Sequence, residues 1–136
     1  MKLLKLVALF LASVAFAFAA EVPKIPAAEA AKLVASGKAV LVDVREASEC
    51  AASGVAQPAL VLPKSDFDGA QKEWKDFLAK VGDKQVILYC RSGNRSGIVA
   101  AALAAKGIRV ANLGGLKDWT DAGLPLRKVE TAAQNK

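Results

Sequence analysis

One stretch constrains this chain more than any other: an apolar run, a short polar loop and an alanine-rich run follow one another between residues 85 and 107. Residues 85–89 (QVILY) are typical of a buried parallel strand, and residues 97–107 (GIVAAALAAKG) of a helix that ends at a glycine. A loop that joins a strand to a helix directs backbone N–H groups toward one point, which favours an anion. We therefore expect an α/β fold with an anion-binding loop, whose residues are Cys90, Arg91, Ser92, Gly93, Asn94, Arg95 and Ser96.

Cys90 is the residue in this loop that can carry covalent chemistry. A free thiol has a pKa near ~8.5, and a helix N-terminus with nearby cations lowers it by roughly one to several units. Arg91 and Arg95 flank the loop and stay charged at any working pH. We predict that Cys90 is a nucleophile and that its substrate is an anion. The alternative is a buried, inert cysteine, which does not require two arginines and a glycine beside it.

The first residues have the pattern of a secretory signal peptide. Residues 1–5 are short and basic, residues 6–18 are apolar except for Ser13, and residues 17–19 (AFA) form an A-x-A cleavage pattern. The apolar run is short for a membrane span. We expect residues 1–19 to be removed, residues 20–126 to form one domain, and residues 127–136 to form a flexible tail. The mature protein is then expected in the periplasm or outside the cell, with no membrane attachment.

Composition argues against several classes of function. The chain has no histidine, which removes Cys-His and Ser-His-Asp catalysis and most catalytic zinc sites. We expect neither a metal nor an organic cofactor. The formal net charge of +6 becomes +4 once Lys2 and Lys5 leave with the signal peptide. Because the remaining basic residues alternate with acidic ones, we expect no nucleic-acid partner.

Cys50 and Cys90 are the two cysteines of the chain, too few for a metal site or a disulfide framework. They could pair in an oxidising compartment, and a thiol redox protein using both is one reading of the sequence. The chain lacks a C-x-x-C motif, and a nucleophile at a strand end is normally kept accessible. We therefore expect Cys90 to act as a free thiol.

Helical and strand patterns alternate along the rest of the chain. We predict helices over residues 27–36, 47–52, 67–80 and 116–122, with Ser65 or Asp66 capping the third, and strands over residues 39–44, 59–63 and 109–113. The strands are nearly all apolar, which favours a parallel sheet covered by helices on both faces. Asp43 and Arg45 follow one strand and are expected at the level of Cys90, with a structural ion pair or turn cap as their favoured role.

Four motifs in this order resemble those of single-domain rhodaneses, the thiosulfate sulfurtransferase-like family. They are Asp43-Val44-Arg45-Glu46, the segment 54–63, the loop 90–96, and the pattern L-G-G…W…A-G-L-P over residues 113–125. The second motif departs from the family pattern at Val55, Pro58 and Val61. The resemblance implies a three-layer fold, in which a central parallel sheet of about five strands has helices on both faces.

The same resemblance implies a sulfurtransferase. Cys90 would take the outer sulfur of thiosulfate or a similar donor as a persulfide, and pass it to a thiophilic acceptor such as cyanide, a thiol or a carrier protein. No cofactor is implied, and the protein would be a monomer or a weak dimer. Asp43 and Arg45 would support the site, and the substrate-binding residues would be Arg91, Ser92, Gly93, Asn94, Arg95 and Ser96.

Two other functions use a similar loop. A non-enzymatic persulfide carrier would keep Cys90 but would need a protein partner. A cysteine phosphatase or arsenate reductase requires C-x5-R, whereas Cys90 and Arg95 form C-x4-R and residue 96 is serine. The shorter loop is expected to make a tighter pocket that fits a single sulfur.

Overall fold

The computed structural model of the protein describes residues 21–130. The predicted signal peptide, residue 20 and residues 131–136 of the predicted tail lie outside the described residues. Within residues 21–130, no helix is both long and apolar enough to cross a membrane. The elements, in chain order, are α1 (Ala27–Ala35), β1 (Ala39–Asp43), α2 (Ala47–Ser53), β2 (Val55–Ala56), β3 (Leu60–Val61), α3 (Lys64–Asp68), α4 (Lys72–Lys80), β4 (Gln85–Cys90), α5 (Asn94–Ala105), β5 (Val110–Gly115), α6 (Leu116–Asp121) and β6 (Leu126–Arg127).

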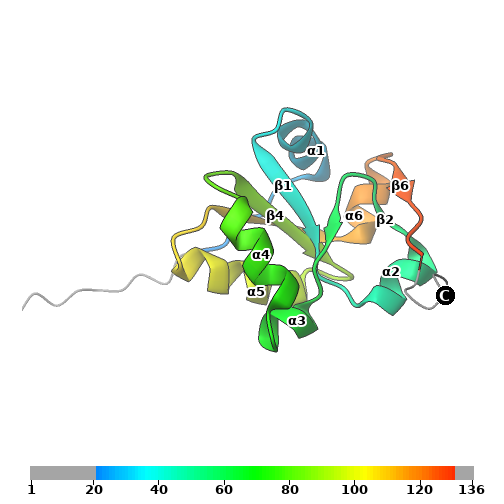
Figure 1. Cartoon of the computed structure of the whole chain (residues 1–136). Coiled ribbons are helices and arrows are strands. Elements are labelled where there is room, and N and C mark those ends of the chain that lie inside the picture. Colours follow the sequence, from blue (N-terminus) through cyan, green and yellow to red (C-terminus); the bar gives the residue numbers. More distant parts are fainter. Residues whose placement is uncertain (1–20, 131–136) are drawn as a thin grey trace, which may run out of the picture.

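A four-stranded sheet with the order β3-β1-β4-β5 forms the centre of the molecule (Figure 1). All three strand pairs are parallel, so the carboxyl ends of the strands lie at one edge. β4 has a neighbour on each side, and its last residue is Cys90. The sheet has four strands where about five were expected, and beside β5 the described residues form only an isolated parallel bridge between Lys24 and Asn112. β2 pairs with β6 in a separate antiparallel ribbon.

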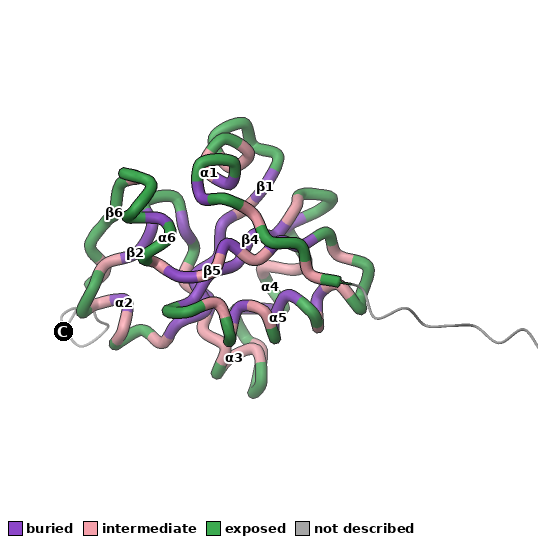
Figure 2. The backbone as a smooth tube through the Cα atoms, turned by 180° about the vertical axis from the view of Figure 1, so that it is seen from behind, coloured by how far each residue is buried: buried purple, intermediate pink, exposed green. Residues whose placement is uncertain are grey.

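Helices cover both faces of the sheet, as predicted. Trp119 of α6 and residues of α1 pack with Tyr89 on one face, whereas Trp74 of α4 and residues of α5 pack with Leu88 on the other. Figure 2 shows that buried residues concentrate in the central strands. The prediction of a three-layer α/β fold is therefore confirmed.

The predicted helix over residues 67–80 is wrong, because the chain forms two helices there. α3 ends at Asp68, and α4 begins at Lys72 after Gln71, which has a φ of 54°. The Asp66 carboxylate accepts hydrogen bonds from the backbone N–H groups of residues 72, 73 and 74. Asp66 thus caps α4 across the break, which satisfies donors that a continuous helix would have bonded internally.

Two other predicted boundaries also change. The helix after the cysteine loop begins at Asn94 rather than at residue 97, so the loop is shorter than predicted. Arg127, predicted to start the flexible tail, lies in β6 and pairs with Val55 of β2. The Arg127 guanidinium also donates hydrogen bonds to the carbonyls of Gln57 and Ala59. These contacts extend the folded domain past residue 126.

Candidate active site

The cysteine loop is a tight connection between the centre of the sheet and α5. Cys90 ends β4, and Gly93 precedes the first residue of α5 with a φ of 95°. This left-handed conformation favours glycine, because a side chain there would clash with the backbone. The turn places the first N–H groups of α5 around the sulfur of Cys90, where they favour negative charge.

The thiol of Cys90 lies at the base of this loop. Its Sγ accepts a hydrogen bond from the Gly93 N–H at 3.0 Å, and the Ser96 hydroxyl lies 3.4 Å away. Burial alone would raise the pKa of Cys90, but hydrogen bonds from the Ser96 side chain and from the N–H groups of Ser96, Ser92 and Gly93 outweigh it. The pKa of Cys90 is therefore lowered, which favours the nucleophilic thiolate.

Cys90 is more enclosed than the sequence predicted. It is 1% exposed, whereas the side chains of Arg91, Ser92 and Asn94 lie on the outside of the loop. The loop therefore presents backbone N–H groups inward and its polar side chains outward. A reagent must reach the sulfur with a narrow end.

Asn112 of β5 forms three hydrogen bonds that hold the cysteine loop and the residues after β5's bulge in place. Its Nδ2 donates to the Gly93 carbonyl at 2.9 Å, and its Oδ1 accepts from the Ser96 hydroxyl at 2.8 Å and from the Gly114 N–H at 3.1 Å. Gly93 and Ser96 are two of the residues whose donors lie against the sulfur of Cys90. Asn112 therefore holds both donors in place.

The glycine pair after Asn112 makes room for the loop. A Cβ on Gly115 would lie 2.3 Å from the carbonyl oxygen of Arg91, so a larger residue cannot fit without moving the loop. The N–H of Gly115 donates to the Asp118 carboxylate at 2.8 Å. The L-G-G motif thus sets the distance between β5 and the residue after Cys90.

The two arginines of the loop have different surroundings. Arg95 donates to both carboxylate oxygens of Glu49, at 2.7 and 2.8 Å, and so links α5 to α2. These bonds hold the pKa of Glu49 down to about 2, mainly through the Arg95 hydrogen bond. Arg91 is exposed and takes part in no ion pair found within residues 21–130. The two predicted anion-binding arginines are therefore not equivalent.

Asp43 and Arg45 form a buried ion pair on the other face of the sheet. Asp43 lies in register with Tyr89, and successive side chains of a strand point to opposite faces, so Asp43 and Cys90 point away from each other. The Arg45 guanidinium bonds to the Asp43 carboxylate at 2.7 Å and to the carbonyl of Gly54 at 2.8 Å. The pair lies at the level of Cys90 but holds the chain between α2 and β2.

Cys50 and Cys90 are both free thiols with opposite character. Cys50 is 0% exposed, and burial together with the Asp43 charge raises its pKa to about 11. A thiol with such a pKa is neutral and unreactive at ordinary pH. Of the two cysteines, Cys90 is therefore the one with thiolate character.

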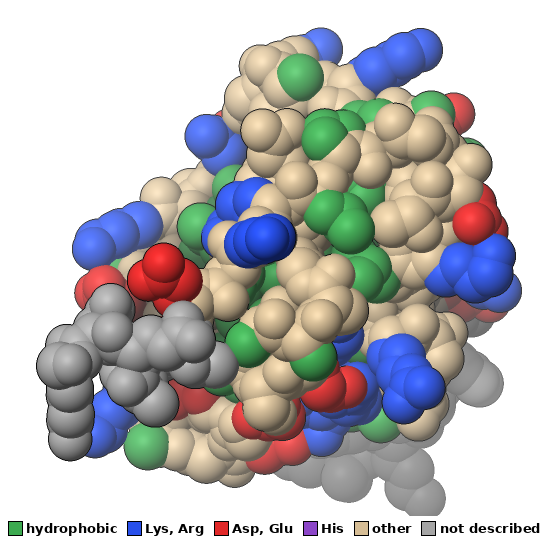
Figure 3. All heavy atoms as spheres, turned by 90° about the vertical axis from the view of Figure 1, so that its right-hand side faces the viewer, with side chains coloured by type: hydrophobic (Ala, Val, Ile, Leu, Met, Phe, Trp, Pro, Cys, Tyr) green, Lys and Arg blue, Asp and Glu red, His purple; other side chains and the backbone are tan. Residues whose placement is uncertain are grey.

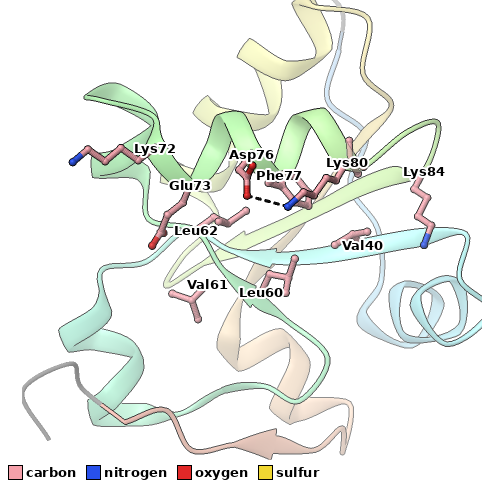
Figure 4. A pocket seen from close by; sticks show the side chains of 11 residues that line it. Val40, Leu60, Val61, Leu62, Lys72, Glu73, Asp76, Phe77, Lys80 and Lys84 are labelled. Carbon is pink, nitrogen blue, oxygen red and sulfur yellow. Dashed lines mark hydrogen bonds and ion pairs between the residues drawn. The ribbon is translucent and has the colours of Figure 1, made fainter. Parts of the chain in front are cut away.

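An apolar groove of 610 Å³ lies apart from the cysteine loop. It runs between β3 and α4, where Leu60 and Phe77 line it and an Asp76–Lys80 ion pair lies on its rim (Figure 4). None of residues 90–96 lines this groove. Nowhere in residues 21–130 do three or more Cys, Asp or Glu side chains form a cluster that could hold a metal ion.

Sequence reasoning missed two residues that shape the site, Asn112 and Glu49. Asn112 is a polar residue in an otherwise apolar strand, and that misfit was the available signal. Glu49 lies three residues after Glu46, and the two form a capping box at the start of α2. A helix-capping pattern gives no sign that the same carboxylate also binds Arg95.

Comparisons with known proteins show what the chain is similar to. The family model for the rhodanese-like domain matches residues 26–122. A sulfurtransferase of Allochromatium vinosum is 39% identical over 89 residues, which are 64% of this chain and 77% of that protein. An uncharacterised protein of Synechocystis is 37% identical over 95 residues, 68% of this chain, and the match spans only 49% of that longer protein.

A solved structure shares the fold over most of its length. The human single-domain sulfurtransferase superimposes with a TM-score of 0.56 at 27% sequence identity, covering 73% of this chain and 96% of the human chain. The likeness therefore extends over most of both chains rather than over one local motif.

Proposed function

Because the chain belongs to the rhodanese-like family, we propose that it moves a sulfane sulfur from thiosulfate or a similar donor to a thiophilic acceptor through a persulfide on Cys90. The observation that carries this proposal is the Cys90 sulfur, which meets the Gly93 N–H at 3.0 Å and has a lowered pKa. The sulfurtransferase of Allochromatium vinosum supports sulfur transfer in general.

The proposed first step is a displacement at the outer sulfur of thiosulfate. The Cys90 thiolate attacks that sulfur, the S–S bond of thiosulfate breaks with its electron pair, and sulfite leaves. Cys90 then carries a persulfide anion, which the N–H groups of the loop stabilise. In the second step, cyanide or a thiol attacks the outer sulfur, which restores the Cys90 thiolate. No proton, metal or organic cofactor is needed for either transfer.

The enclosure of Cys90 supports a donor with a narrow reactive end. A terminal sulfane sulfur is one atom wide, whereas a phosphate ester or arsenate brings a tetrahedral group that an arginine must surround. Arg95, the candidate for that role, is held by both oxygens of Glu49. The phosphatase and arsenate reductase alternative is therefore less well supported than sulfur transfer.

A persulfide carrier that serves a protein partner is the second candidate function. It would use the same persulfide, and the outward side chains of Arg91, Ser92 and Asn94 would then meet the partner. We further propose a periplasmic or secreted protein, a monomer or weak dimer, with no nucleic-acid partner. Figure 3 shows Lys and Arg side chains interspersed with Asp and Glu on the side of the molecule where α2 lies.

The intact mass of the purified protein, measured before and after thiosulfate, tests the proposal. We expect a gain of one sulfur that cyanide reverses, retained in Cys50→Ser and lost in Cys90→Ser. No gain in fully reduced protein would refute transfer from thiosulfate. Steady turnover with thiosulfate and cyanide alone would favour an enzyme, whereas labelling without turnover would favour the carrier.

A further inference from the structure

The Glu49–Arg95 pair changes the charge that a donor meets at the cysteine loop. We propose that Glu49 is a specificity-determining residue, which neutralises Arg95 and so shifts the preference of the site from dianionic donors toward donors of lower charge. This inference rests on the proposed sulfur-transfer function. It concerns a residue of α2, outside the loop.

Glu49 and Arg95 form a bidentate ion pair. Both guanidinium NH₂ groups of Arg95 bond to the two oxygens of Glu49, and the side chains are 31% and 32% exposed. Such a fork-to-fork arrangement fixes both groups in one orientation. Glu49 is itself fixed, because its Oε2 also accepts from the Glu46 N–H at 2.9 Å.

The pair is near enough to Cys90 for its charge to matter. The pKa of Arg95 is raised chiefly by its hydrogen bond to Glu49, and the charges of Cys90 and Glu46 raise it further. Arg95 directly precedes Ser96 in α5, and the Ser96 hydroxyl lies 3.4 Å from the Cys90 sulfur, so the Glu49–Arg95 pair lies beside the point of attack. Without Glu49, the positive charge of Arg95 would act on an incoming anion; with Glu49, the two charges largely cancel at that distance.

Arg91 is left as the loop cation without a partner in the described part of the chain. The side chain of Glu46 adds a further negative charge beside α2, where it accepts a hydrogen bond from Ser65 at 2.9 Å. The two arginines of the loop are therefore offset by two glutamates at the start of α2, one bonded to Arg95 and the other near enough for its charge to act on Arg95. This balance gives little advantage to a donor that carries two negative charges over a donor that carries one.

Two donors with the same reaction and different charge test the inference. Thiosulfate is a dianion that releases sulfite, and methanethiosulfonate is a monoanion that releases methanesulfinate after the same attack on the outer sulfur. The quantity to measure is the kcat/KM for thiosulfate divided by the kcat/KM for methanethiosulfonate, at low salt and with cyanide as acceptor. In Glu49→Gln the side chain keeps an acceptor for Arg95 and Glu46 but loses its charge. We expect the ratio to move about two- to fivefold toward thiosulfate, and less at high salt.

Two further variants serve as controls for the Glu49→Gln result. Arg91→Met should move the ratio the other way, because it removes the uncompensated charge. In the double variant Glu49→Gln with Arg95→Met, the pair is removed as a whole, so the ratio should stay near that of the wild type. If Glu49→Gln does not fold, as judged by circular dichroism, Glu49→Ala takes its place, with the same expected shift toward thiosulfate. A fall in the ratio of the double variant like that of Arg91→Met would mean that Arg95 binds the donor directly, and the inference would be wrong.

The inference and the proposed function fail in different ways. If neither donor places a sulfur on Cys90 of the wild type, the proposed function fails first. If both donors react but the Glu49→Gln ratio equals that of the wild type, sulfur transfer stands and the role of Glu49 is refuted.

Discussion

Breaking the buried ion pair of Asp43 and Arg45 is expected to destabilise the fold strongly. In Arg45→Met, the Asp43 carboxylate stays at 0% exposure but loses three guanidinium contacts of 2.7 to 3.1 Å. Removing one partner of a buried pair costs about 3–5 kcal/mol, because the remaining charge is uncompensated. For a domain of this size, that loss lowers the melting temperature by roughly 10–25 °C.

Urea unfolding of the purified variant, followed by tryptophan fluorescence, measures this cost. Lys80→Met is the matched control, since it breaks an ion pair whose side chains are 75% and 71% exposed. We expect this control to lose less than about 0.5 kcal/mol. Combining Arg45→Met with Asp43→Asn removes the buried charge and should recover part of the stability.

Two outcomes would refute this role of the Asp43–Arg45 pair. A loss below about 1 kcal/mol in Arg45→Met would mean that Asp43 is protonated or solvated without its partner. A double variant as unstable as Arg45→Met alone would mean that the arginine acts through Ser53 and Gly54, to which it also donates, rather than through the Asp43 charge.

Three further predictions concern the loop and its surroundings. Ser96→Ala should raise the pKa of Cys90, seen in the pH dependence of the thiolate absorbance, and an unchanged pKa would count against the hydrogen bond. Gly115→Ala should slow persulfide formation, measured by rapid mixing, by about 100-fold, because the loop must move away from the new Cβ. A wild-type rate would show that β5 shifts and the loop keeps its position. Since the pKa of Glu49 is lowered to about 2, its ionisation stabilises the folded state above about pH 4.5, and this contribution is lost as the pH falls toward 2. The free energy of unfolding should therefore fall less steeply with acid in Glu49→Gln than in the wild type, and parallel curves would contradict the pairing.

The parts of the fold that depend on neighbouring residues were predictable. The buried strand, the cysteine at its end and the alanine-rich helix follow one another directly, and their local patterns agree with one another. The three-layer arrangement follows from apolar strands that alternate with helices. The four motifs at residues 43–46, 54–63, 90–96 and 113–125, taken in order, identified the family.

The features that the sequence did not predict depend on residues far apart in the chain. Asn112 reaches Gly93 and Ser96 across the β4–β5 pair, and Arg95 reaches Glu49 from another helix. The spacing of apolar residues along a sequence does not indicate such contacts. Arg95 was therefore predicted to bind the substrate, although its guanidinium is bonded to Glu49. The break before α4 was missed because the apolar positions keep their helical spacing on both sides of Gln71, whereas the left-handed backbone of Gln71 and the Asp66 cap, which separate the helices, leave that spacing unchanged.

The parallel pairing of β1 with β4 has a consequence for how the chain acquires its reactivity. Residues 39–43 pair with residues 85–89, so the two central strands join parts of the chain that are separated by the whole segment 44–84. Contacts between distant residues form slowly during folding. The Gly93 and Ser96 donors take their places against the sulfur only when β4, β5 and α5 are assembled. A nascent or partly unfolded chain therefore carries two ordinary thiols, and Cys90 acquires its lowered pKa only where these elements are in place.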